Sequence, residues 1–209
     1  MEDKKTQLVH RRREEILAAA KHIFAKNGFR RTKIDEIAVR LSVGKGTLYR
    51  YFKDKKSLFL AVFEQGMTGL RQAMRANIEP VIDPKNKIST AVRTYFEFFD
   101  NDRELIEILM QVRSEFKDDY RRVFLALYND YIVKIQENLR VGVKTGVFRK
   151  LDVEKTAEAM SATLQGVLQS FYVREFSPET AVPNVENLTD RTEVVTALLL
   201  EGLLKTDSA

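Results

Sequence analysis

The chain contains no cysteine among its 209 residues, which excludes disulfide bonds and thiolate metal sites. It has only two histidines, His10 and His22, which lie among charged and small residues near the start. We therefore expect two solvent-exposed helix histidines rather than a zinc site. No run of 18 apolar residues occurs, so a membrane-spanning helix is not expected. The first residues also lack the apolar block of a secretory signal, and a cytoplasmic location is expected.

Proline is scarce, and the pattern of apolar residues follows the period of a helix rather than that of a strand. The chain is therefore predicted to be all-α, with one small N-terminal core and one larger C-terminal core. The predicted helices span residues 12–26, 34–41, 45–51, 55–76, 86–100, 103–115, 118–145, 153–175 and 187–205. A loop is expected at 177–184, where two of the four prolines lie.

Positive charge is concentrated in residues 1–56. This segment has 16 Lys and Arg against 7 Asp and Glu, whereas residues 57–209 have 19 against 23. A basic segment joined to a near-neutral remainder is typical of a nucleic-acid-binding domain attached to a larger domain. A solvated basic face is the alternative. We predict a DNA-binding domain at 1–56 and a helical effector-binding and dimerisation domain at 57–209.

Two short helical segments, 34–41 and 45–51, are joined by Ser42, Val43 and Gly44. This spacing predicts a helix-turn-helix motif, whose second helix enters the major groove of DNA. Its outward face is expected to present Lys45, Gly46, Thr47, Tyr49 and Arg50, of which Arg50 is the candidate for pairing with guanine. Lys55, at the start of the next helix, is expected to hold a phosphate.

The motif and its surroundings resemble the N-terminal domain of the TetR family of bacterial transcriptional regulators. The matching residues are Ile16, Ala20, Phe24, Gly28, Phe29, Thr32, Ile34, Ile37, Ala38, Val43, Lys45, Gly46, Thr47, Leu48, Tyr49, Tyr51, Phe52, Lys55 and Leu58. The resemblance implies a homodimeric, ligand-responsive and usually repressing DNA-binding protein. It also implies phosphate contacts from Thr47, Tyr49, Tyr51 and Lys55, although packing between helices is the alternative for Tyr51.

The full set predicted to contact DNA comprises Thr32, Lys33, Lys45, Gly46, Thr47, Tyr49, Arg50, Tyr51 and Lys55. Two positions in the turn depart from the family pattern, which usually has glycine where this chain has Ser42 and serine where it has Gly44. Ser42 is therefore expected to adopt a left-handed backbone conformation, and a different turn geometry is the alternative. Lys33 stands where a hydroxyl often caps the second helix, and Thr32 is expected to substitute.

The last two long helices are predicted to form the dimer interface. Small residues recur four apart in 153–175, which permits close approach of helices, and the final segment is apolar on more than one face. The predicted interface residues are Ala162, Gly166, Ser170, Val195, Leu199 and Gly202. Ordinary packing within one chain is the alternative.

The middle helices are rich in aromatic residues, with a few polar residues among them. Together with the family resemblance, this favours a pocket for a small apolar effector. The predicted lining is Phe96, Phe99, Met110, Arg113, Phe124, Tyr128 and Gln165, and core packing is the alternative for each aromatic residue.

The expected partners are a pseudo-palindromic double-stranded DNA operator, a second copy of the chain and a small apolar effector, with repression as the expected mode. No catalytic residue, cofactor or metal is expected. An enzyme is the first alternative, but phosphate-binding glycine loops and paired Glu-x-x-His motifs are lacking. A DNA binder without sequence preference is the second alternative.

Overall fold

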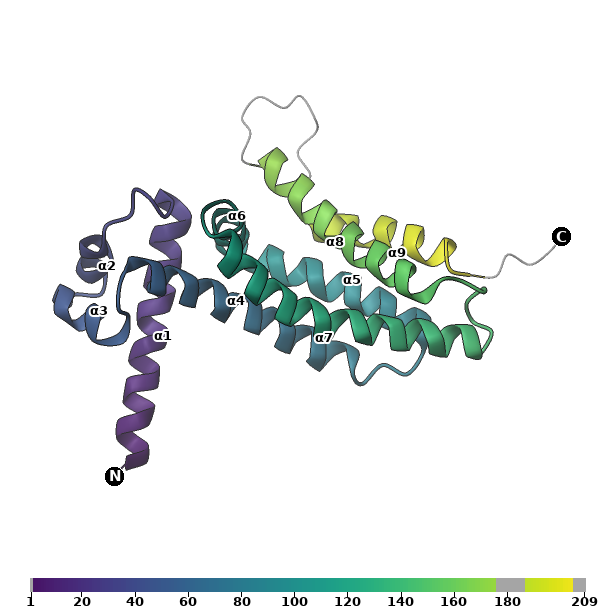
Figure 1. Ribbon diagram of the computed structural model, residues 1–209, viewed down its shortest axis with the longest axis horizontal. Helices are drawn as coiled ribbons and strands as arrows, with labels where there is room; N and C mark the ends of the chain where they lie inside the picture. The colour runs from purple at the N-terminus through teal and green to yellow at the C-terminus, as the bar shows by residue number, and fades with distance from the viewer. Residues whose placement is uncertain (1, 176–186, 205–209) are drawn as a thin grey trace. The chain divides into compact units, whose positions relative to one another are not determined.

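The computed structural model describes residues 2–175 and 187–204 (Figure 1). Across these ranges the chain forms the helices α1 (Glu2–Asn27), α2 (Ile34–Arg40), α3 (Lys45–Tyr51), α4 (Lys55–Ile78), α5 (Pro84–Asn101), α6 (Arg103–Glu115), α7 (Lys117–Lys144), α8 (Val153–Glu175), η1 (Thr189–Arg191, a 3-10 turn) and α9 (Thr192–Glu201). A single antiparallel bridge joins Phe148 to Leu204, and the described part of the chain contains no longer strand. The all-α prediction is confirmed. The loop predicted at 177–184 lies outside the described residues.

The chain packs as two compact units. The first comprises Met1–Thr68 and Arg103–Val123, and the second comprises Gly69–Asp102 and Phe124–Ala209. Both α4 and α7 run from one unit into the other. The helix α6, which was expected to line the effector pocket, packs with the N-terminal helices. The functional boundary between residues 56 and 57 stays a prediction, because packing divides the chain differently.

The first unit is organised around α1. Ile16, Ala20 and Phe24 lie on its buried face and have no exposed surface, as the apolar stripe predicts. Aromatic rings extend this core, with Phe24, Phe29, Phe59 and Phe116 in contact at centroid separations from 4.9 to 6.1 Å. These rings come from α1, the following turn, α4 and the residue that joins α6 to α7. The core therefore ties α6 to the N-terminal helices.

Local signals explain where several helices begin and end. Gly28 has a φ of +78° and closes α1, and its N–H donates to Phe24 O at 2.9 Å. At the start of α4, the N–H of Ser57 donates to the carboxylate of Asp54 at 2.7 Å, and the N–H of Asp54 donates to the hydroxyl of Ser57 at 3.0 Å. This backbone donation lowers the pKa of Asp54. Asp83 caps α5 by accepting a hydrogen bond from the N–H of Asn86 at 2.8 Å, with Pro84 in the first turn of the helix.

The second unit buries one stripe of α8. Ala157, Met160, Leu164, Leu168 and Phe171 are at most 7% exposed, so they form the core face of this helix. Ala162 and Gly166 lie outside this buried stripe, and both are exposed.

The final helix requires a correction. Predicted as one segment, 187–205, it consists of η1 followed by the shorter α9. Val195 is 5% exposed and Leu199 packs partly against the core of its own unit, so Val195 does not lie on an open face. The exposed apolar residues of α9 are instead Val194 and Leu198, at 62% and 64%. The sequence pattern did not separate these two faces because both are apolar.

Candidate nucleic-acid interface

The turn between α2 and α3 is held by main-chain hydrogen bonds. The N–H of Ser42 donates to Val39 O at 3.0 Å, and that of Val43 donates to Ala38 O at 3.0 Å. Ser42 has a φ of +53°, which confirms the predicted left-handed residue. Such a conformation costs a residue other than glycine about 1–2 kcal/mol. Gly44 then precedes α3 in an extended conformation and provides no side-chain cap.

One face of α3 is fixed in the core and the other is open. Leu48 is 2% exposed and Phe52, directly after the helix, is 7% exposed. The opposite face presents Lys45, Gly46, Tyr49 and Arg50, all exposed, with Tyr49 at 46%. The predicted orientation of α3 is therefore confirmed, whereas the DNA contacts of these side chains stay predictions. Thr47 and Tyr51 are half-buried beside this face.

Lys45 has a partner in the free protein. Its ammonium lies 3.1 Å from a carboxylate oxygen of Asp35 on α2, and both side chains are at least half exposed. The hydrogen bond from Lys45 to Asp35 and the attraction between their charges raise the pKa of Lys45. Lys45 therefore stays charged at neutral pH. An exposed ion pair is also weak enough to be exchanged for a phosphate.

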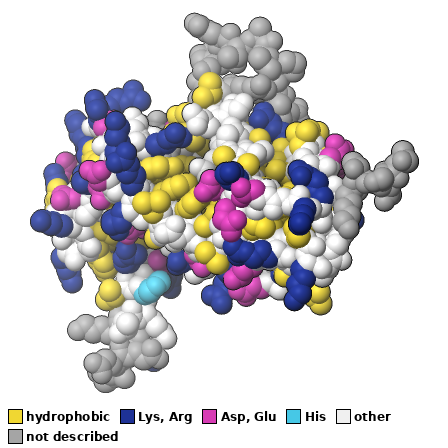
Figure 2. All heavy atoms as spheres, turned by 45° about the vertical axis from the view of Figure 1, so that its right-hand side comes forward, with side chains coloured by type: hydrophobic (Ala, Val, Ile, Leu, Met, Phe, Trp, Pro, Cys, Tyr) yellow, Lys and Arg dark blue, Asp and Glu magenta, His cyan; other side chains and the backbone are white. Residues whose placement is uncertain are grey.

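In the space-filling view, Lys and Arg side chains gather at the left of the molecule, on the side where α2 and α3 lie in Figure 1 (Figure 2). Lys33 is among the exposed residues of this region and precedes α2 without capping it. Arg50 forms no hydrogen bond or ion pair with any residue that the structure describes, so its guanidinium is open to a ligand. The surface thus combines the hydrogen-bond donors of Lys and Arg with open space at Gly46, where a DNA backbone could approach closely.

Thr32 does not belong to this surface. Its side chain is 1% exposed, and its hydroxyl donates to Gly28 O at 2.8 Å. It therefore stabilises the turn between α1 and α2. The prediction that the side chain of Thr32 contacts DNA is therefore wrong. The expectation that Thr32 caps α2 is also wrong, because this helix has no side-chain cap.

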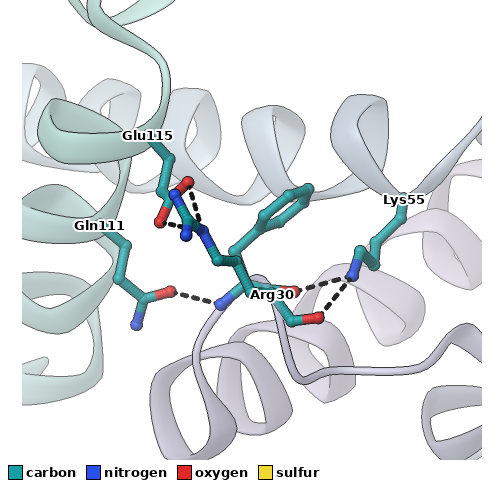
Figure 3. Close-up of polar contacts among 5 residues, drawn as sticks. Arg30, Lys55, Gln111 and Glu115 are labelled. Atoms are coloured by element: carbon teal, nitrogen blue, oxygen red, sulfur yellow. Dashed lines mark hydrogen bonds and ion pairs between the residues drawn. The ribbon is translucent and has the colours of Figure 1, made fainter.

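Lys55 is also committed to that turn. Its ammonium donates to Phe29 O at 2.9 Å and Arg30 O at 3.2 Å, as Figure 3 shows. It also donates to Thr32 O at 2.9 Å. It also lies 4.5 Å from the centre of the Phe29 ring. Because an ammonium has three donors, these carbonyls use all of them. In the free protein Lys55 therefore fixes the turn that carries α2, and its predicted phosphate contact stays a prediction.

The helix α6 holds the same turn from its other side. Gln111 accepts a hydrogen bond from the N–H of Phe29 at 2.9 Å and donates to Phe24 O at 3.2 Å. Glu115 pairs with Arg30 at 2.8 Å, as Figure 3 shows. We call these contacts, together with those of Lys55, the turn clamp. The sequence indicated Gln111 only as a polar residue among apolar ones, and its partners, more than 80 positions away, left no local signal.

The residues predicted to line an effector pocket are not all in one unit. Phe96 and Phe99 have no exposed surface and pack against Tyr95 at 5.9 and 5.0 Å between ring centres. Phe124 and Tyr128 stack on one another along α7 at 5.6 Å. Gln165 donates to the hydroxyl of Ser161 at 3.1 Å. These residues belong to the second unit, whereas Met110 and Arg113 lie on α6 in the first. The pocket stays a prediction.

A surface groove of about 590 Å³ lies elsewhere in the second unit. It is lined by Ser89, Arg93, Glu97, Thr189, Thr192, Glu193, Thr196 and Ala197, none of which was predicted to bind the effector. Among the described residues, no three His, Asp or Glu side chains lie close enough to hold a metal ion. In the same ranges, every helix is too short or too polar to cross a bilayer.

The fold and this surface define a helix-turn-helix DNA-binding regulator. Two family sequence models match the chain: "Bacterial regulatory proteins, tetR family" at residues 16–62, and "Tetracyclin repressor-like, C-terminal domain" at residues 81–169. The chain belongs to the TetR family of transcriptional regulators, which bind DNA and are not enzymes.

The chain is similar to several known regulators in sequence or in structure. The HTH-type transcriptional activator FasR of Mycolicibacterium smegmatis is 30% identical over 134 residues, which is 64% of this chain and about half, 53%, of that protein. The fatty acid metabolism regulator protein of Bacillus subtilis is 21% identical over 162 residues, 77% of this chain and 84% of that one. A crystal structure of the Bacillus subtilis regulator FadR with stearoyl-CoA aligns with a TM-score of 0.76 at 21% identity, over 90% of this chain and 98% of that chain.

The assignment of Lys55 to the turn clamp leads to a prediction about stability. Replacing Lys55 by Met removes the ammonium but keeps most of the aliphatic stem, and leaves three carbonyls without their donor. We expect the free energy of unfolding to fall by about 2–3 kcal/mol. For a chain of this size the melting temperature should fall by roughly 4–12 °C, measured by calorimetry.

The exposed neighbour Lys53, replaced by Met, is the matched control and should change the melting temperature by little. If Lys55→Met instead melts like the parent protein and loses affinity for every duplex, Lys55 is a phosphate ligand and not part of the turn clamp.

Proposed function

We propose that the chain is a homodimeric, sequence-specific regulator that represses transcription from a pseudo-palindromic operator and is released by a fatty-acyl effector. The observation that carries this proposal is the open face of α3, on which Lys45, Gly46, Tyr49 and Arg50 stand on a helix anchored by Leu48 and Phe52. A rigid helix with donors on one face is what reading the major groove requires.

The proposed roles follow from the surroundings of each side chain. Arg50, open on the outer face, is proposed to pair with a guanine. Thr47, Tyr49 and Tyr51 are proposed to contact phosphates, with Lys33 at the edge of the surface. Lys45 is proposed to exchange Asp35 for a phosphate on binding, since the ion pair between them is exposed and weak.

Replacing Arg50 by Ala tests whether this residue reads sequence. In a selection of duplexes from a random pool, we expect the preference at one base pair of each half-site to weaken by about 1–3 kcal/mol. Affinity for random duplex should change much less. The exposed Arg71 of α4, replaced by Ala, is the matched control for charge. A uniform loss for all duplexes would identify Arg50 as a phosphate ligand. A parent protein with no preferred duplex would instead favour the architectural alternative.

Dimerisation is supported by two exposed features of the second unit. On α8, Ala162 and Gly166 are exposed, and a Cβ added at Gly166 would meet no other atom within 4 Å. On α9, Val194 and Leu198 expose large apolar side chains. Open small residues permit close helix approach, and exposed apolar residues favour burial in a partner. Two copies would also place two α3 helices in successive major grooves, roughly 34–36 Å apart.

Replacing Leu198 by Glu should therefore weaken the dimer, because a carboxylate would be buried without a partner. We expect sedimentation to show monomer where the parent protein is dimeric, and operator affinity to fall at least tenfold because two half-sites are no longer held together. Val141 of α7, which is 50% exposed, is replaced by Glu as the control. Were Leu198→Glu to stay dimeric with full affinity, the interface would not include this face of α9.

A fatty-acyl effector is supported by two lines of evidence. Relatives are described as a fatty acid metabolism regulator and as a regulator in complex with stearoyl-CoA. The second unit also has an apolar interior rich in aromatic rings along α5 and α7. Because Phe96 and Phe99 are fully buried, an acyl chain would have to displace packed rings. Binding would therefore favour a conformation different from the one described here.

The test of the effector uses stearoyl-CoA, with free CoA and acetyl-CoA as controls that lack the long chain. We expect stearoyl-CoA to weaken operator binding by about 5–150-fold, the range of typical coupling energies, and to raise the melting temperature of the protein. Equal effects of all three compounds, or no effect of any, would contradict a long-chain effector while leaving DNA binding intact.

A further inference from the structure

The first helix extends well beyond the predicted start at residue 12. It begins at Glu2, about four turns before residue 16, where the match to the family begins. Throughout residues 6–11 every side chain is exposed, as is that of Lys4. We call residues 4–13 the N-terminal arm of α1. Figure 1 shows this end of α1 running past the label of α3 to the marked N-terminus.

Packing contributes little to most of the arm, because the side chains of Lys4 and of residues 6–11 are exposed. Leu8 is 72% exposed and Val9 is 49% exposed. A helix of this length is marginal in water without tertiary contacts. The two i,i+3 and i,i+4 pairs of Arg12 and Arg11 with Glu15 are exposed and contribute only a few tenths of a kcal/mol each. A bound partner would stabilise the arm considerably more than these pairs do.

The charge of the arm indicates what that partner is. Residues 4–13 include Lys4, Lys5, Arg11, Arg12 and Arg13, together with His10, and contain no acidic residue. Glu2 and Asp3 precede the arm, and Glu14 and Glu15 follow it. Five cations in ten residues on an unpacked helix favour a polyanion over a neutral or basic surface.

The arm also leaves the first unit at the edge of the proposed reading surface. The guanidinium of Arg13 lies 5.4 Å from the centre of the ring of Phe52, the residue directly after α3. Glu14 is held by a hydrogen bond from Gln65 of α4, which fixes the root of the arm. With a rise of 1.5 Å per residue, Lys4 lies about 14 Å beyond Arg13, or the length of about four base pairs.

We propose that the N-terminal arm binds the phosphate backbone of the DNA that flanks each operator half-site. This rests on the proposed function, because it assigns a second contact surface to the same DNA-binding protein. The arm adds affinity and lengthens the bound segment, whereas α3 reads the sequence. Phosphate contacts are independent of base identity, so the operator preference does not depend on the arm.

The test compares the full-length protein with the variant Lys4→Gln, Lys5→Gln, Arg11→Gln, which keeps Arg12 and Arg13 and the whole core. Affinity for the selected operator is measured against salt concentration. We expect the slope of log K against log salt to become shallower by about 0.9 for each phosphate that the variant no longer neutralises. The preferred sequence should be unchanged. The control removes three exposed charges from the second unit, Lys85→Gln, Lys144→Gln, Lys150→Gln, and should keep the parent slope.

Duplex length provides an independent readout. Extending the operator duplex by about four base pairs on each side should strengthen binding of the parent protein and of the control, but not of the arm variant. Equal slopes and equal increases in affinity for all three proteins would overturn the proposal. A variant with Leu8→Ser and Val9→Ser provides a second way to overturn the proposal. If this variant no longer self-associates but keeps the parent salt slope, the arm contacts another protein chain and not DNA. A parent protein without a preferred duplex would contradict the proposed function instead.

Discussion

The ammonium group of Lys55 makes the interaction on which the placement of the helix-turn-helix depends. The turn between α1 and α2 directs several carbonyls toward one point, and a single cation satisfies three of them. A neutral side chain has too few donors for this task, and an arginine would present a flat fork rather than a compact group of three donors. Since α2 begins directly after this turn, and α3 packs on α2, the direction of the outer face of α3 follows from the position of the turn.

The turn clamp also explains why α6 packs with the N-terminal helices. Gln111 accepts from the N–H of Phe29 and donates to the carbonyl of Phe24, which also accepts from the N–H of Gly28, so it adds two side-chain bonds to the end of α1. A shift of α6 by even a fraction of a helical turn would break both bonds and the contact of Glu115 with Arg30. Because only Asp102 separates α5 from α6 in the chain, a change in α5 has a short covalent path to these bonds. A displacement of α6 would therefore act directly on the turn that carries α2.

The sequence predicted most of the fold because its helices have strong local signals. The period of apolar residues placed α3, α6 and α8 with the bounds that the structure has, and Ser42 adopts the predicted left-handed conformation. The start of α1 was wrong by ten residues because a polar, exposed helix has no apolar stripe to reveal it. Val195 was wrong because an apolar helix offers no polar face to set its orientation. The side-chain contact of Thr32 was wrong for a different reason: a hydroxyl suits a backbone carbonyl as well as a phosphate, and only tertiary structure decides between the two.

The polar contacts of the first unit differ in strength according to their task. Those that define shape, at Thr32, Lys55 and Gln111, are wholly or partly buried and end on main-chain groups, so breaking them leaves unsatisfied donors or acceptors. Those on the proposed DNA surface, between Lys45 and Asp35 and between Arg11 and Glu15, are exposed ion pairs of low strength. A phosphate can displace the carboxylate in such a pair at little cost, whereas it cannot compete for Lys55 without dismantling the turn. Strong contacts therefore maintain the geometry of α3, and weak ones keep the surface cations ordered but available.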